Sequence, residues 1–178
     1  MAKSAFCIAS SYQQAENIVN NLKNAGFGSN DISVLFPDKR GTKDFAHEQN
    51  TKAPEGAALG ASTGGVLGGA FGWIVGIGAL AIPGVGPLIA AGPIMAALSG
   101  VAVGATLGGI TGALVGMGIP ELEAKRYEGK VKGGGVLISV HTEDGKQLDL
   151  AKTIYKQAGA EDISSAGEAG VSKEKQRV

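Results

Sequence analysis

The stretch GAALGASTGGVLGGAFGWIVG, residues 56–76, carries a glycine at every fourth position. A second stretch, GVAVGATLGGITGALVG at residues 100–116, repeats the pattern. Because residues i and i+4 lie above one another on a helix, each series predicts a helix with a smooth face against which another backbone packs closely. We therefore predict helix packing at Gly56, Gly60, Gly64, Gly68, Gly72, Gly76, Gly100, Gly104, Gly108, Gly112 and Gly116.

The segment that contains both series, residues 56–120, has no charged side chain. Each glycine in a helix interior costs about 0.8–1 kcal/mol relative to alanine in water, and residues 56–82 contain nine of them. In hydrocarbon, an unpaired backbone amide costs several kcal/mol, so lipid keeps even a glycine-rich segment helical. The segment therefore predicts a transmembrane hairpin with arms near 56–82 and 94–118, a turn at residues 83–87, and Pro93 in the first turn of the second arm.

Basic residues lie on both sides of this segment and are absent from its central turn. The excess of Lys and Arg in cytoplasmic loops then predicts that both flanks, and so both termini, lie in the cytoplasm. The flanking basic residues are Lys39, Arg40, Lys43 and Lys52 before the segment, and Lys125, Arg126, Lys130 and Lys132 after it.

The rest of the sequence predicts two similar strand–helix–strand units. In the first, Ser11-Tyr12-Gln13-Gln14 is a capping box that starts a helix, and Gly26 ends that helix. In the second, Asp144 caps a helix, and Asp162-Ile163-Ser164 in the last strand repeats Asp31-Ile32-Ser33 of the first unit. Two such units predict an α+β fold, a ferredoxin-like βαββαβ sandwich with both helices on one face of a four-stranded antiparallel sheet. The long glycine-zipper α-helical hairpin is then inserted between strands 2 and 3.

This interpretation divides the chain into six parts. They are the first strand–helix–strand half (1–37), a polar connector (38–55), the helical hairpin (56–119), a charged connecting helix (120–132), the second half (133–166) and a flexible tail (167–178).

The sequence offers little for catalysis or metal binding. Two histidines have acidic neighbours, but neither set has the spacing of a known metal site. Gly133-Gly134-Gly135 precedes a strand, which is the reverse of the order in a phosphate-binding loop. We predict no catalytic residue, no cofactor and no metal site, and the net charge of zero gives no argument for nucleic acid. The two histidine sets are His47 with Asp44 and Glu48, and His141 with Glu143 and Asp144.

Several short motifs carry a resemblance to a known family. They are His47-Glu48, Thr51-Lys52-Ala53-Pro54-Glu55-Gly56, Gly118-Ile119-Pro120-Glu121, Glu123-Ala124-Lys125 and Gly134-Gly135-Val136-Leu137. With these motifs the chain resembles bacterial general stress or heat-induced stress proteins of the YflT type, in versions that carry a glycine-zipper membrane hairpin. The resemblance covers roughly residues 5–165 and implies a bacterial envelope or stress context, with the hairpin in the inner membrane. It implies no activity and no binding residues.

Three functions follow from these patterns as expectations. The first is a non-enzymatic, membrane-anchored, stress-associated protein that forms a homo-oligomer through its glycine faces, while the cytoplasmic sheet domain oligomerises or docks a partner protein. The second is a cytoplasmic assembly, a shell or filament in which the hairpins of many copies bury one another. The third is an oligomeric pore lined by hydroxyl groups. A small subunit of a respiratory complex ranks after these.

Overall fold

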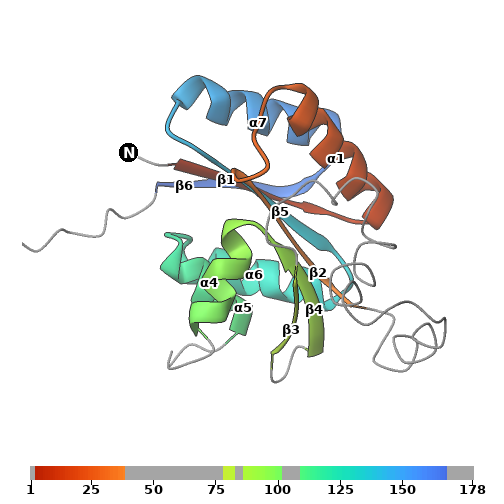
Figure 1. The fold of residues 1–178 in the computed structure, drawn as a ribbon, viewed down its shortest axis with the longest axis vertical. Helices are drawn as coiled ribbons and strands as arrows, with labels where there is room; N and C mark the ends of the chain where they lie inside the picture. The colour runs from red at the N-terminus through yellow and green to blue at the C-terminus, as the bar shows by residue number, and fades with distance from the viewer. Residues whose placement is uncertain (1–2, 39–77, 83–85, 102–108, 168–178) are drawn as a thin grey trace, which may run out of the picture.

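The computed structural model describes residues 3–38, 78–82, 86–101 and 109–167 (Figure 1). Its strands form one antiparallel six-stranded sheet in the order β3-β4-β2-β5-β1-β6. The strands are β1 (Lys3–Ala9), β2 (Ile32–Pro37), β3 (Gly78–Ile82), β4 (Gly86–Ala91), β5 (Val136–Thr142) and β6 (Glu161–Gly167). The helices are α1 (Tyr12–Asn24), α4 (Pro93–Val101), α5 (Gly109–Gly116), α6 (Glu121–Lys132) and α7 (Gly145–Gln157).

Helix α1 begins at the predicted capping box. Ser11 is the N-cap, and its hydroxyl accepts a hydrogen bond from the backbone N–H of Gln14 at 3.2 Å. The side-chain oxygen of Gln14 in turn accepts from the backbone N–H of Ser10 at 2.7 Å. Two backbone donors at the start of the helix are thereby satisfied. The box is confirmed, although the glutamine bonds the amide one residue before the N-cap.

The central strands bury side chains on both faces of the sheet. In β1, Ala5 and Cys7 belong to the core on one face, whereas Phe6 and Ile8 belong to the core on the other. All four of these residues are almost fully buried. Strands that are covered on both faces have continuous apolar sequences, which is what residues 5–9 show. The sheet therefore needs a cover on each side.

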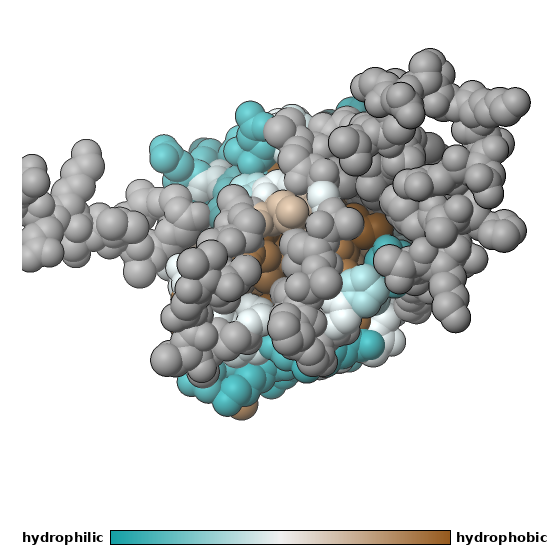
Figure 2. Space-filling model, turned by 60° about the horizontal axis from the view of Figure 1, so that its bottom comes forward, coloured by the Kyte–Doolittle hydropathy of each residue, from teal (hydrophilic) through white to brown (hydrophobic). Residues whose placement is uncertain are grey.

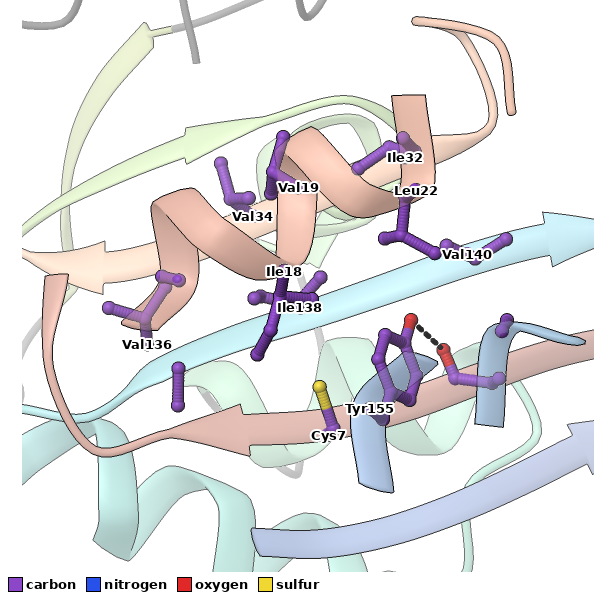
Figure 3. Packing of buried hydrophobic residues seen from close by; sticks show 14 of the residues in the cluster. Cys7, Ile18, Val19, Leu22, Ile32, Val34, Val136, Ile138, Val140 and Tyr155 are labelled. Carbon is purple, nitrogen blue, oxygen red and sulfur yellow. Dashed lines mark hydrogen bonds between the residues drawn. The ribbon is translucent and has the colours of Figure 1, made fainter. Parts of the chain in front are cut away.

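Helices α1 and α7 cover the first face (Figures 1 and 3). Ile18 and Leu22 of α1 point toward the strands, and so does Tyr155 of α7 (Figure 3). The hydroxyl of Tyr155 donates a hydrogen bond of 3.3 Å to the carbonyl of Ala5, so the ring is buried with its polar atom paired. This first layer fixes the two strand–helix–strand units against one another.

Helices α4, α5 and α6 cover the second face (Figure 1). Their apolar side chains pack on Phe6, Ile8, Leu35 and Leu137 of the sheet. The covering residues are Ile94 and Leu98 of α4, Ile110, Ala113 and Leu114 of α5, and Ala124, Tyr127 and Val131 of α6. The molecule consequently has three layers, with the sheet in the middle.

The predicted fold class is wrong. The described residues form a six-stranded antiparallel sheet with five short helices, and no long helical hairpin occurs among them. Residues 78–82 were expected at the end of a helix but form β3, and Gly86 and Pro87, expected in the turn of the hairpin, begin β4. The physical reason is that the second face of the sheet is apolar, and the helices at residues 93–101, 109–116 and 121–132 supply its cover.

The predictions of a transmembrane hairpin and of an inner-membrane location are also wrong. The predicted second arm, 94–118, is divided into α4, with nine residues, and α5, with eight. None of the helices in the described ranges combines the length and the apolar character that a membrane span requires. Residues 56–77 of the predicted first arm, 56–82, lie outside the described residues. Pro93, predicted in the first turn of a helix, does begin α4.

The turn between β4 and α4 requires glycine. Gly92 has φ +76°, and a Cβ built on it would lie 2.2 Å from the carbonyl oxygen of Ile32. Gly26 after α1 has φ +93°, but a Cβ there would meet nothing within 4 Å. A side chain at position 26 would therefore cause backbone strain alone. A side chain at position 92 would cause the same strain and would also clash with the backbone of β2.

We predict that Gly92→Ala lowers the free energy of unfolding by at least about 3 kcal/mol, because the clash adds to the strain. Gly26→Ala should lower it by about 1–2 kcal/mol. Urea denaturation of both variants and the wild type measures the difference. Equal losses for the two variants would contradict the close approach of this turn to β2.

Candidate functional site

The two edges of the sheet are built differently, and this contrast is the most informative surface feature of the molecule. At the β6 edge the pairing with β1 is irregular, since Phe6 pairs with Ser164 but Ile8 pairs with Glu161. Asp162 lies in this bulge with φ +48°, a conformation that non-glycine residues seldom adopt. A bulge and acidic residues on an edge strand both oppose pairing with a further strand.

Helix α6 holds the β6 edge in place through charged side chains. Lys130 Nζ lies 2.6 Å from a carboxylate oxygen of Glu161, and Arg126 lies 3.4 Å from Asp162. Lys130 is also 3.9 Å from Asp162. The pair with Glu161 is solvent-exposed and the pairs with Asp162 are partly so, so each contributes little on its own, but together they keep α6 next to this edge.

Tyr127 anchors the same helix from inside. Its hydroxyl donates to the backbone carbonyl of Asp162 at 2.6 Å and lies 2.6 Å from Ser164 Oγ. Burial raises the pKa of Tyr127 to about 12, although the hydrogen bond with Ser164 acts in the opposite direction. The phenol therefore stays protonated at neutral pH and serves as a fixed hydrogen-bonding link.

Among the described residues, the β3 edge has none of these protective features. Residues 78–82 read Gly-Ala-Leu-Ala-Ile, without charge or proline. One side of β3 pairs with β4 over the whole strand, and no described residue pairs with its other side. Met95 of α4 approaches the strand, since a Cβ built at Gly78 would lie 2.7 Å from Met95 Cε. The view that brings the bottom of Figure 1 forward shows some apolar residues at the surface (Figure 2).

A carboxylate joins α5 to α6 and so holds the layer that covers the second face. Glu128 Oε2 accepts hydrogen bonds from Thr111 N at 3.0 Å and from Thr111 Oγ1 at 2.5 Å. Its other oxygen lies 2.7 Å from Lys132 Nζ. Because Thr111 is in the first turn of α5, the carboxylate satisfies a backbone donor that has no partner within the helix.

The same contacts change the acidity of Glu128. Partial burial alone would raise the pKa of its carboxyl group, but the hydrogen bonds from Lys132 and Thr111 and the charge of Lys132 together lower it. The ionised form is therefore the one that joins the two helices.

Ser4 and His141 are the one pair of described residues with the geometry of a nucleophile and its base. They are opposite one another on β1 and β5, and Ser4 Oγ lies 2.8 Å from His141 Nδ1. Ser4 has no exposed surface, however, so a substrate cannot reach its oxygen. The pair acts here as a cross-strand hydrogen bond within the second core.

The two histidine sets weighed in the sequence analysis differ in what the structure describes. His141, with Glu143 and Asp144, does not form a group of three that could hold a metal, and no other such group occurs among the described residues. His47, Glu48 and Asp44 lie outside these residues.

Three of the eleven predicted helix-packing glycines are described. Gly100 lies in α4, whereas Gly112 and Gly116 lie in α5, so the series does not continue along one helix. A Cβ at Gly116 would meet no described atom within 4 Å. The other eight are outside the described ranges: Gly56, Gly60, Gly64, Gly68, Gly72, Gly76, Gly104 and Gly108.

Sequence reasoning missed the role of α6. The sequence was interpreted as giving a charged connecting helix there, and the helix does carry two i,i+4 ion pairs, Glu121–Lys125 at 2.6 Å and Glu128–Lys132 at 2.7 Å. The buried residues Ala124, Tyr127 and Val131 follow at intervals of three and four, which is the spacing of an apolar helix face. That spacing was the available signal for a helix packed on the sheet.

Comparison with protein-family models, with curated proteins and with solved structures gives no match for this chain. The resemblance to YflT-type stress proteins therefore stays a prediction.

We predict that Glu128→Gln lowers the free energy of unfolding at neutral pH by about 1–2 kcal/mol, because a neutral amide makes weaker bonds to Thr111 and Lys132. Glu121→Gln is the matched control, since it removes the exposed i,i+4 pair on the same helix and should cost at most about 0.5 kcal/mol. Chemical denaturation of both variants provides the measurement.

The difference between wild type and Glu128→Gln should also depend on pH. The folded pKa of Glu128 lies below the ordinary value of 4.5, so the carboxylate's contribution is complete above that value and is lost as the pH falls through the folded pKa. A difference that stays constant from pH 7 into this acidic range would contradict the assignment.

Proposed function

We propose that the protein is a non-enzymatic module that forms a homodimer by pairing strand β3 with β3 of a second copy. The uncharged edge of β3 is the observation that carries this proposal. An edge strand presents a row of backbone N–H and C=O groups, and a second strand satisfies them by extending the sheet. The membrane anchor of the sequence-based hypothesis has no part in it.

The contrast with the other edge supports the choice of β3. The β6 edge carries Glu161 and Asp162, a bulge and the ion pairs to α6. These are devices by which proteins prevent edge-to-edge pairing. If both edges were solvent-exposed in the same way, both would need such protection. The β3 edge, on which no described residue pairs, is therefore the one that we expect a partner strand to cover.

A two-fold axis is compatible with this pairing. In an antiparallel β3–β3 pair centred on Leu80, Gly78 of one copy would lie opposite Ile82 of the other, and Ala79 opposite Ala81. The same surface is then used by both copies, which gives a closed dimer. A shell or filament needs a further contact, so closure at two copies separates this proposal from the assembly hypothesis. The stress-associated context remains an expectation from the resemblance.

We expect the wild-type protein to have twice the chain mass of 17.8 kDa in sedimentation equilibrium. Leu80→Lys should shift it to the monomer mass, because the two new charges would lie opposite one another at the two-fold axis. Ala81→Lys provides a second variant on the same strand.

Ser165→Lys is the matched control, because it places the same charge at an exposed position on the protected edge strand β6. It should leave the dimer mass unchanged. Urea midpoints confirm that each variant is folded. A wild-type monomer at all concentrations, or a dimer that survives both β3 substitutions, would overturn the proposal.

A further inference from the structure

A methionine of α4 reaches the edge strand that the proposed dimer uses. Helix α4 and strand β3 lie next to one another (Figure 1), and the side chain of Met95 extends to Gly78. A Cβ built on Gly78 would lie 2.7 Å from Met95 Cε and 3.8 Å from Met95 Sδ. The end of the methionine therefore occupies the space that a side chain at position 78 would need, and a glycine in the strand permits this close approach.

The start of α4 holds Met95 in this position. The backbone N–H of Ile94 donates to Ser33 Oγ at 3.2 Å, and the backbone N–H of Met95 donates to the carbonyl of Gly92 at 3.0 Å. The side chain of Ile94 is buried in the second core, whereas that of Met95 is half-buried. Because the helix is fixed to β2, a chemical change at the end of Met95 acts on β3 and is not absorbed by a shift of α4.

The same methionine would lie at the interface between two copies. In the β3–β3 pair proposed above, Gly78 of one copy is opposite Ile82 of the other, so Met95 lies beside the strand of the second copy as well as its own. The two-fold symmetry places a Met95 at both ends of the paired strands, and a change at this residue therefore acts twice on one interface. Methionine suits such a place, because its unbranched side chain adapts to irregular apolar gaps and is enriched at interfaces.

The sulfur-containing residues of the described ranges differ in their access to an oxidant. They are Cys7, Met95 and Met117. Cys7 has no exposed surface, and burial raises the pKa of its thiol, so the reactive thiolate is disfavoured. Met95 and Met117 are both half-buried, and a thioether reacts with peroxides without first losing a proton. Met117 follows α5 in the same covering layer and so provides a comparison for Met95.

We propose that a peroxide separates the two copies by oxidising Met95, so that the β3 interface is redox-sensitive. This inference rests on the proposed function. One oxygen atom of hydrogen peroxide is transferred to Met95 Sδ: an S–O bond forms, the O–O bond breaks, the sulfur is oxidised and the peroxide is reduced to water. A methionine sulfoxide reductase reverses the step, because two thiols become a disulfide and the oxygen leaves as water.

The sulfoxide weakens pairing because it is polar at an uncharged edge. Residues 78–82 carry no charged side chain, and the sulfur lies close to the first of them. A sulfoxide oxygen that loses its water without gaining a hydrogen bond is unfavourable, so it opposes the approach of a second strand. The reaction takes place on the single chain, in which Met95 is half-buried and a peroxide reaches its sulfur.

The test is sedimentation equilibrium of the full chain before and after treatment with hydrogen peroxide, with peptide mass mapping to locate the added oxygen. We expect oxidation of Met95 to raise the dissociation constant of the dimer at least about tenfold. Methionine sulfoxide reductases of both stereospecificities, supplied with dithiothreitol, should restore the original value. A urea midpoint measured on the oxidised chain shows whether it remains folded.

Three variants separate Met95 from other sites of oxidation. Met95→Leu should dimerise as the wild type does and should not respond to peroxide, because leucine has a similar volume and no sulfur. Met95→Gln places a polar group of similar length at this position and should weaken the dimer without any oxidant. Met117→Gln is the matched control, since Met117 is half-buried in the same layer, and it should leave the dissociation constant unchanged.

The outcomes distinguish this inference from the proposed function. A wild-type dimer whose dissociation constant stays the same when Met95 is oxidised would overturn the redox inference and leave β3 pairing intact. A peroxide response that persists in Met95→Leu, an oxidised chain that is unfolded, or a folded chain in which Met95 resists oxidation would overturn it as well. A wild-type monomer before any peroxide is added would overturn the proposed function, and the redox inference with it.

Discussion

The structure depends on one constraint: the central strands of the sheet are apolar on both faces. Phe6, Ile8, Leu35 and Leu137 face away from α1 and α7, and they are almost fully buried. A sheet with only one helical layer would expose these side chains to water, which is unfavourable in proportion to the apolar area. The layer formed by α4, α5 and α6 removes that exposure, and its attachments decide how the rest of the chain is arranged.

Three polar contacts fix this second layer at defined points. The Ser33 hydroxyl accepts a hydrogen bond from the backbone N–H of Ile94 at 3.2 Å, which sets the start of α4 over β2. Glu128 joins α5 to α6, and Tyr127 joins α6 to β6. Apolar packing has no strong directional preference, whereas these bonds do. The layer is therefore held by apolar contacts and oriented by a few buried or half-buried hydrogen bonds.

Local signals in the sequence predicted the two strand–helix–strand units well, because caps and helical apolar faces are encoded within a few residues. Ser11 and Asp144 are both N-caps, and Pro93 begins a helix. The described part of the glycine-rich block was misinterpreted because its uncharged composition fits both lipid and a protein interior. The continuous apolar run at residues 5–9 was the evidence for a second cover. The roles of Tyr127, Thr111 and the bulge at Asp162 depend on contacts between residues distant in the sequence, which no local pattern reveals.

The central claim is that residues of the glycine-rich block form the second layer over the sheet. Hydrogen–deuterium exchange followed by mass spectrometry, with the full chain in buffer without detergent, tests this most directly. The account predicts that amides of residues 88–91, 94–101 and 110–116 exchange slowly, with protection approaching that of β5 at the centre of the sheet. Exchange of these segments at the rate of an unstructured peptide, while β5 stays protected, would contradict it.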